Sequence, residues 1–206
     1  MRTEFIAAVK ANQNAFGVEL SDAAIERLAD YHDLIQEHNP ILHLVGPCTT
    51  EEFATRHILE SLTLLEYLAK SIWFADVGTG AGLPSIPCLL TREDLKAVLV
   101  ESKEKKSKFL ALAVEKLRLK HRTRLSATQF SETNLGHCKA VTCRALDKFT
   151  EKLPGLIKWS ARSQMLLFGG ENLEKALDEQ RLRFAKKLMP MSERRSLFVV
   201  ASGDKT

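Results

Sequence analysis

The chain has 206 residues, 45% of them hydrophobic and 27% charged, and its formal net charge at neutral pH is +4. This composition is that of an ordinary globular protein, and it excludes a disordered chain, a collagen-like chain and a coiled-coil rod. No apolar stretch approaches the roughly 20 residues that cross a bilayer, and the amino end lacks the pattern of a signal peptide, so we expect no membrane segment.

The four cysteines indicate reduced thiols, and neither a metal site nor a disulfide framework. They form no CxxC pair, and no histidine stands at metal-ligand spacing from them. Isolated cysteines of this kind are typical of a reducing compartment. We therefore expect a cytoplasmic protein without a bound metal.

Positive charge is concentrated in one short part of the sequence. Residues 102–124 carry nine Lys and Arg against two Asp and Glu, whereas residues 1–70 carry five against eleven. Such asymmetry favours a polyanionic partner, most simply a nucleic acid. A solvated, lysine-rich helix face explains the same charges equally well.

The first 70 residues are predicted to be helical. Apolar side chains recur at helical spacing between residues 24 and 35, which places them on one stripe of a helix. That helix is expected to end at Asn39-Pro40, because the residue before a proline avoids the α conformation. Thr49 and Glu52 have the spacing of a capping box and predict the start of a second helix.

From residue 71 onward, short apolar runs alternate with helix-like stretches. The pattern predicts strands at 72–75, 97–100, 124–127, 140–143, 165–168 and 197–200, and helices at about 84–92, 103–119, 148–160 and 171–187. This alternation predicts an α/β fold with a mostly parallel sheet that is covered on both faces. Ligands of such sheets bind beyond the carboxyl ends of the strands, where we expect Asp76, Glu101, Ala127 and Arg144.

A glycine-rich segment from Asp76 to Pro84 joins the first strand to the helix that follows it. Its three glycines at alternate positions permit a sharp turn and the close approach of a ligand. No Gly-Lys-Ser/Thr follows, so the segment is not a P-loop. Gly80 to Ser85 comes close to the GxGxxG/A pattern of nicotinamide sites, but the carboxylate of Asp76 would repel a pyrophosphate, and no second domain for a reducible substrate is evident.

An acidic residue before the glycines suits S-adenosylmethionine, which carries an amine and a sulfonium but no phosphate. In this hypothesis Asp76 meets the cationic amine, and Glu101 accepts two hydrogen bonds from the ribose hydroxyls. Ala127 and Thr128, at the end of the third strand, would flank the adenine. The residues thus favour a methyl donor over a dinucleotide.

Three segments carry a resemblance to a known family. They are DVGTGAGLPSIP at 76–87, RHILES at 56–61 and CRA at 143–145. They resemble motifs of the bacterial 16S ribosomal RNA guanine-N7 methyltransferases, also called glucose-inhibited division protein B, and the order of elements agrees over nearly the whole chain. The resemblance implies a class I, Rossmann-like S-adenosylmethionine-dependent methyltransferase domain at 71–206, preceded by a helical extension at 1–70.

The resemblance also bears on the cofactor site. By position, Gly78 and Leu83 would contact the cofactor, Ala127 and Thr128 would do so mainly through the backbone, and Arg144 would lie near its methionine end. Together with the residues argued above, the predicted cofactor-binding set is Asp76, Gly78, Gly80, Leu83, Glu101, Ala127, Thr128 and Arg144.

The implied reaction is methylation of N7 of a guanine in 16S ribosomal RNA, at position 527 in the 530 loop. Guanine N7 has a free lone pair and no proton at neutral pH, so positioning is needed and a general base is not. Arg144 is the candidate for orienting substrate or cofactor, and Asn39, Arg56 and His57 are weaker substrate-side candidates; a purely structural role for His57 is an equal alternative. We expect a monomer that acts on 16S rRNA or on an assembly intermediate of the small ribosomal subunit.

Two segments depart from the family pattern. His43-Leu44-Val45 stands where the family usually has Asn-Leu-Thr, and Gly169-Gly170 where it usually has Lys-Gly. These departures bear on the target and not on the cofactor. The alternatives are a class I methyltransferase with another RNA or small-molecule substrate, and a non-catalytic RNA-binding protein of ribosome assembly.

Two other methylation chemistries find little support in the sequence. Cys143 lies near the position of the cytosine-C5 nucleophile, but the Pro-Cys pair of those enzymes is missing. The Asp/Asn-Pro-Pro-aromatic motif of enzymes that methylate exocyclic amines is absent as well.

Overall fold

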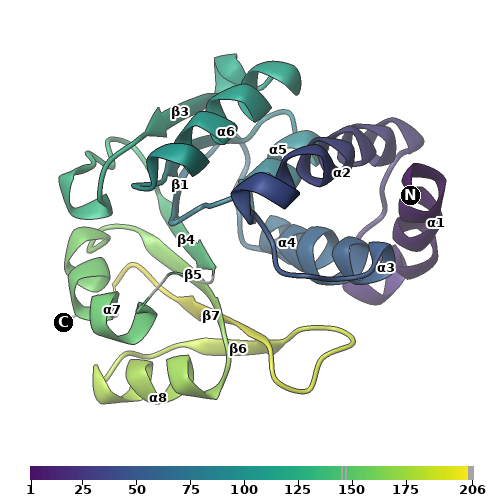
Figure 1. The fold of residues 1–206 in the computed structure, drawn as a ribbon. Coiled ribbons are helices and arrows are strands. Elements are labelled where there is room, and N and C mark those ends of the chain that lie inside the picture. Colours follow the sequence, from purple (N-terminus) through teal and green to yellow (C-terminus); the bar gives the residue numbers. More distant parts are fainter. Residues whose placement is uncertain (145, 147, 204–206) are drawn as a thin grey trace.

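A computed structural model describes residues 1–144, 146 and 148–203, so Ala145 of the CRA segment lies outside the described residues. Its centre is a seven-stranded sheet of order β3-β2-β1-β4-β5-β7-β6 (Figure 1). The strands are β1 (Trp73–Val77), β2 (Lys96–Val100), β3 (Thr123–Ser126), β4 (Ala140–Arg144), β5 (Gln164–Gly169), β6 (Ala185–Leu188) and β7 (Ser196–Val200).

Strands β1 to β5 pair in parallel, and β7 lies antiparallel between β5 and β6. The interior strands β1, β2, β4 and β5 are almost wholly buried, as strands covered on both faces must be. The prediction of an α/β fold with a mostly parallel sheet is therefore confirmed. Because parallel strands end at the same edge, the ends of β1 to β4 meet on one side of the molecule.

Helices cover both faces of this sheet. They are α1 (Arg2–Asn12), α2 (Asp22–Leu42), α3 (Thr50–Glu52), the π-helix η2 (Phe53–Leu59), α4 (Glu60–Leu62), α5 (Ser85–Thr91), α6 (Glu104–Lys116), α7 (Phe149–Trp159) and α8 (Glu171–Glu179), with short 3-10 turns η1 (Gln13–Phe16), η3 (Thr63–Glu66), η4 (Lys120–Arg122) and η5 (Phe130–Glu132). Figure 1 shows α1 to α4 together on one side of the sheet, with α7 and α8 away from them.

Each face of the sheet has its own hydrophobic core. Side chains before and after residue 70, such as Phe53, Phe74 and Leu99, belong to one continuous core with α5 and α6. The other core joins the opposite sides of the strands, including Val77, to Leu153 of α7 and the apolar stripe of α8. The N-terminal helices thus form the cover of one sheet face, which is what places them beside the strand ends.

The second predicted helix begins at the predicted capping box. The amide of Glu52 donates to Thr49 Oγ1 at 3.1 Å, and the amide of Thr49 donates to Glu52 Oε2 at 3.0 Å. The helix then widens into η2, which carries Arg56 and His57. Wide turns of this kind are rare and occur frequently at functional sites.

The predicted end of the first long helix is wrong. Helix α2 continues through Pro40 to Leu42 and ends at His43, which has a left-handed φ of 47°. In the last turn of a helix, a proline removes only one backbone hydrogen bond, so the helix tolerates it. The turn is closed by the amide of His43, which donates to the carbonyl of Asn39 at 3.0 Å.

The predicted helix at 171–187 is also wrong in its second half. Helix α8 ends at Glu179, and residues 185–188 form β6, which pairs with β7. The sequence Ala-Lys-Lys-Leu favours a helix by propensity, but pairing with the buried strand β7 decides its conformation. Among the described residues, no helix has both the length and the apolar character needed to cross a membrane.

Candidate functional site

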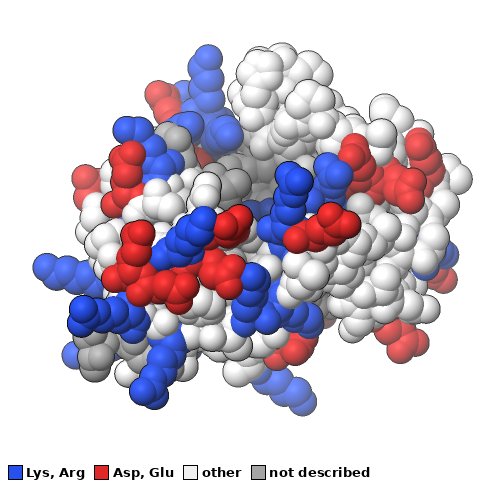
Figure 2. All heavy atoms as spheres, turned by 90° about the horizontal axis from the view of Figure 1, so that it is seen from below, with Lys and Arg blue, Asp and Glu red and all other residues white. Residues whose placement is uncertain are grey.

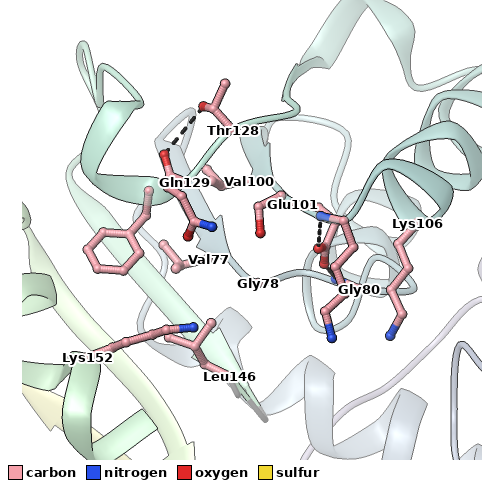
Figure 3. A pocket seen from close by; sticks show the side chains of 13 residues that line it. Val77, Gly78, Gly80, Val100, Glu101, Lys106, Thr128, Gln129, Leu146 and Lys152 are labelled. Atoms are coloured by element: carbon pink, nitrogen blue, oxygen red, sulfur yellow. Dashed lines mark hydrogen bonds between the residues drawn. The ribbon is translucent and has the colours of Figure 1, made fainter. Parts of the chain in front are cut away.

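A pocket lies at the carboxyl ends of the parallel strands, where the topology predicts a ligand site. Its volume is about 250 Å³, and it is lined from the glycine loop, from the ends of β1 and β2 and from α6, η5 and α7 (Figure 3). Four of the eight predicted cofactor residues, Gly78, Gly80, Glu101 and Thr128, line it. The other four lie elsewhere around the strand ends.

The glycine loop forms the floor of this pocket. Gly78 and Gly80 have φ values of 68° and 58°, in the left-handed region that favours glycine. A Cβ on Gly78 would stand 2.6 Å from Leu146 Cδ1, and Leu146 itself lines the pocket. The amide of Gly78 is fixed by the carbonyl of Val100 at 2.9 Å. The loop therefore presents bare backbone to a ligand.

Glu101 stands at the edge of the pocket as the sequence predicts. One carboxylate oxygen accepts from the amide of Gly80 at 3.0 Å, and the other accepts from the amide of Lys103 at 2.8 Å (Figure 3). These bonds fix the carboxylate, and each oxygen keeps a free lone pair for a ligand hydroxyl. Of the two predicted residues that follow β3, Thr128 lines the pocket, and Ala127 is exposed beside it.

Asp76 is placed differently from the expectation. Its side chain is fully buried below the loop, where one oxygen accepts from Thr79 Oγ1 and from Ser85 Oγ, each at 2.6 Å. Burial raises the pKa of the Asp76 carboxyl to about 7, although the hydrogen bonds from Ser85 and Thr79 lower it. In this structure Asp76 shapes the loop and does not line the pocket. Leu83 is likewise buried in the core next to the loop.

Arg144 also points away from the pocket lining. Its guanidinium turns toward η2, where Nη2 donates to the carbonyl of Arg56 at 2.6 Å and pairs with Glu60 at 3.2 Å. Neighbouring residues in a strand point to opposite faces, and Asp76 pairs with Thr142, two residues before Arg144. Asp76 and Arg144 therefore share the face that the N-terminal helices cover.

The structure separates the three weaker substrate candidates. Arg56 is half exposed and pairs with Glu52 at 3.1 Å. Burial, and next the charges of nearby arginines, lower the pKa of His57 to about 4, so this ring is neutral at pH 7. Asn39 lies apart on α2 and accepts from the amide of Val45 at 2.9 Å, which holds the His43-Leu44-Val45 segment.

Three lysines surround the pocket that were not predicted as site residues. Lys103 directly precedes α6, Lys106 lies in α6 and Lys152 lies in α7. Figure 3 shows Lys106 and Lys152 on opposite sides of the pocket. None of the three forms an ion pair with a described residue. No sequence signal could single out Lys152, because it lies in the middle of an amphipathic helix and reaches the pocket only through the fold.

The basic residues of 102–124 do not act alike in the structure. Arg122 is buried, and its guanidinium donates to the carbonyls of Leu89, Arg92 and Leu95 at 2.9, 3.0 and 3.2 Å. This arginine is a structural bridge between η4 and the end of α5. Of the remaining basic residues, Lys103 and Lys106 line the pocket, and Lys108 pairs with Glu104 at 2.6 Å.

The face formed by α8 and β6 is not a continuous cationic surface. Figure 2, seen from below, shows Lys and Arg interspersed with Asp and Glu. Lys186 pairs with Glu174 at 2.5 Å, and Lys187 pairs with Glu66. The pocket lysines, which pair with no described acidic residue, therefore differ from the paired lysines on this face.

The described residues limit other chemistries. They contain no group of three or more His, Cys, Asp or Glu side chains that could hold a metal ion. The Cys143 thiol is fully buried, and burial raises its pKa, so it has neither the access nor the thiolate form of a nucleophile.

The pocket fits S-adenosylmethionine by several local features. A side chain on Gly78 would fill the space over the loop, so the loop is built for close approach. Glu101 offers fixed acceptors for a ribose, and Phe130 adds an aromatic wall at the Thr128 end. The lysines offer a counter-charge for a carboxylate.

Comparison with known proteins agrees with this site. Residues 24–204 match the family model GidB, rRNA small subunit methyltransferase G. The chain belongs to this methyltransferase G family. Ribosomal RNA small subunit methyltransferase G of Sorangium cellulosum is 35% identical over 175 residues, which cover 80% of this chain and 72% of that protein. The Neisseria gonorrhoeae protein is 32% identical over 153 residues, covering 74% and 72%.

Solved structures share the fold of the methyltransferase G chain at low identity. A putative tRNA (m1A22) methyltransferase of Streptococcus pneumoniae has a TM-score of 0.57 at 16% identity, with 69% of each chain covered. M. capricolum TrmK in complex with S-adenosyl-homocysteine has a TM-score of 0.57 at 14% identity, covering 70% of this chain and 68% of that one. Family and fold confirm the predicted Rossmann-like methyltransferase and its predicted cofactor, S-adenosylmethionine.

Proposed function

We propose that this protein methylates N7 of a guanine in 16S rRNA, the guanine at position 527 of the 530 loop. The single observation that carries the proposal is the glycine-loop pocket with Glu101 at its edge, in a chain of the methyltransferase G family. The three lysines that line the pocket support an anionic substrate such as RNA.

The residues of the pocket would hold the donor, which supplies an electrophilic methyl group on its sulfonium. The backbone at Gly78 and Gly80 would lie under the donor, and Glu101 would accept from its ribose. Ala127 and Thr128 would flank the adenine. Asp76 and Leu83 would act from below, by fixing the conformation of the loop.

On the substrate side the chain needs to position the base and not to remove a proton. Guanine N7 has no proton to lose, so alignment with the methyl group is the main requirement. The neutral His57 fits this reaction, because no general base is needed. Arg144 and Arg56 would orient the RNA beside the N-terminal helices, and Asn39 would act only through the segment that it holds.

The wider setting forms part of the same proposal. We expect a cytoplasmic monomer with a catalytic domain at 71–206 and a helical extension at 1–70 that faces the RNA. Its substrate is 16S rRNA, either free or in an assembly intermediate of the small subunit.

Mass mapping of 16S rRNA tests the proposal. Unmodified 16S rRNA and small-subunit particles are incubated with the protein and labelled S-adenosylmethionine. The RNA is then cut with a nuclease, and the masses of the fragments are measured by mass spectrometry. One methyl group at N7 of guanine 527 is expected. A label at another base or in another RNA would favour a different substrate. No donor binding by calorimetry at millimolar concentration would favour a non-catalytic RNA-binding protein.

A further inference from the structure

A buried charge cluster joins the N-terminal helices to the end of β4, outside the donor pocket. We propose that Glu60 is a positioning residue that holds the guanidinium of Arg144 for methyl transfer, and that Arg195 in turn holds Glu60. The inference rests on the proposed function in one respect, namely that the transfer step is measured on 16S rRNA.

Glu60 is the centre of the cluster. It begins α4 directly after the π-helix η2, and its side chain is 2% exposed. One carboxylate oxygen pairs with Arg144 Nη2 at 3.2 Å, and the other accepts from Arg195 Nε at 2.8 Å and Nη2 at 2.7 Å. A buried carboxylate is stable only with such partners, so both arginines are fixed with it.

Arg144 is held on several sides. Besides Glu60, its guanidinium donates to the Arg56 carbonyl at 2.6 Å and to Ser61 Oγ at 3.4 Å. Its guanidinium carbon also lies 5.5 Å from the ring centroid of Phe168. These contacts come from η2, α4 and β5, and they fix a planar group that stands at the end of β4 next to the glycine loop.

Among the described residues, Glu60 is the only carboxylate that forms an ion pair with Arg144 or Arg195. Arg144 and Arg195 share its carboxylate, while Arg56 has its own surface partner, Glu52. His57 adds no charge at pH 7. Without the negative charge of Glu60, the largely buried guanidinium of Arg144 and the partly exposed guanidinium of Arg195 would repel each other, and Arg144 would leave its present position.

This cluster and the donor pocket come from different parts of the chain. The described lining of the pocket runs from Val77 to Lys152 and contains no residue of the N-terminal helices. The position of Arg144, in contrast, depends on contacts from η2 and α4. Loss of the Glu60 charge should therefore slow transfer while leaving donor binding intact.

The first test compares Glu60→Gln with Glu51→Gln, an exposed carboxylate in α3 that forms no ion pair with a described residue. We expect kcat on 16S rRNA to fall roughly ten- to a hundredfold in E60Q, because small misplacements of reacting groups cost that much. The KM for the donor and the affinity for S-adenosylhomocysteine should stay within about twofold of wild type, and E51Q should keep the wild-type kcat. Weaker donor binding in E60Q, or an equal loss in E51Q, would overturn the inference.

The second test is a double-mutant cycle with Arg144→Lys. If Glu60 acts through Arg144, E60Q has almost no further effect on kcat in the R144K background, whereas additive losses contradict the inference. Should E60Q not fold, E60Q/R195Q replaces it with R195Q as reference, because this pair removes the unpaired guanidinium as well.

A spectroscopic readout separates the inference from the proposed function. The Nε–H signal of Arg144, assigned by its loss in R144K, should shift in E60Q and stay unchanged in E51Q. If the wild-type protein does not methylate 16S rRNA, the proposed function fails, and this spectrum still decides whether Glu60 holds Arg144. An unshifted signal in E60Q would overturn the inference.

Discussion

The donor pocket and the Glu60 cluster lie near each other at the same strand ends but are built in opposite ways. The pocket is made of bare backbone, one fixed carboxylate and three lysines. The cluster is made of long charged side chains that meet at the two carboxylate oxygens of the buried Glu60. The first leaves room for a ligand, whereas the second fills its space and fixes geometry. The contrast suggests that binding and positioning are carried by separate parts of the chain.

The largest effect is expected from a substitution that blocks the donor pocket and leaves the Glu60 cluster intact. In Gly78→Val, the new side chain meets Leu146 and is strained at a φ of 68°, so it should occupy the space over the loop. We expect the affinity for S-adenosylhomocysteine by calorimetry to fall about a hundredfold or more, which is roughly 3 kcal/mol. Gly136→Val is the matched control, since Gly136 also has a left-handed φ, of 58°, but lies outside the pocket. Equal donor affinity in G78V and wild type would refute the placement of the donor.

A smaller effect is expected when only the ribose acceptor changes. Glu101→Gln keeps the shape of the side chain, but it removes the charge that strengthens hydrogen bonds to a ligand and replaces one acceptor oxygen by an NH2 group that cannot accept from the amide of Gly80 or Lys103. Donor affinity should fall about tenfold, equivalent to roughly 1.4 kcal/mol. Glu115→Gln on the exposed side of α6 is the control and should bind like wild type. If E101Q bound the donor as tightly as wild type, Glu101 would have no role in ribose binding.

The lysines around the pocket should affect RNA and not the folded core. For Lys106→Gln and Lys152→Gln, we expect a few-fold weaker RNA binding at low salt. The slope of log affinity against log salt should drop by about 0.7 to 0.9 for each phosphate contact that is lost. Lys175→Gln, on the charge-balanced α8, should leave the slope unchanged. Slopes that match wild type in both pocket variants would remove RNA from this side of the pocket.

The two regions should also differ in how their contributions to folding stability respond to pH. Asp76 has a raised pKa of about 7, so the folded state holds a proton that the unfolded state has lost, and this group lowers stability as pH rises from about 4 to 7. His57 has a lowered pKa of about 4, so the unfolded state takes up the proton first, and stability falls as pH drops from about 6.5 to 4.

Urea unfolding of two variants between pH 4 and 7 separates these contributions. Asp76→Asn should flatten the loss of stability toward pH 7, and His57→Asn should flatten the loss toward pH 4. Parallel curves for both variants and wild type would mean that neither group titrates as described.

The part of the site that could be predicted from sequence is the part made by local pattern. Glycines at alternate positions and an acid after the second strand are readable in single segments, and Gly78, Gly80 and Glu101 do line the pocket. The fold followed from buried strands alternating with helices. Among the strands, β6 was the one not predicted, because its residues favour a helix by propensity and form a strand only through pairing with β7.

The part that could not be predicted depends on which face a side chain takes. Asp76 and Val77 are neighbours in β1, yet Val77 lines the pocket and Asp76 lies below it, because strand residues alternate between faces. The same alternation turns Arg144 toward the N-terminal helices. Glu60 and Arg195 are 135 positions apart, and no spacing rule connects them.

The π-helix η2 has a consequence for how the chain tolerates changes of length. Each residue along an ordinary helix advances the side-chain direction by about 100°. If one of the residues Phe53–Leu59 were deleted and the wide turns closed to α-helical ones, the residues downstream would keep nearly the same direction, because a π-turn holds about one residue more than an α-turn. Glu60 would then still face the two arginines. The loss of a single codon in this segment should therefore be less damaging than the same loss in α2, where no wide turn can absorb it.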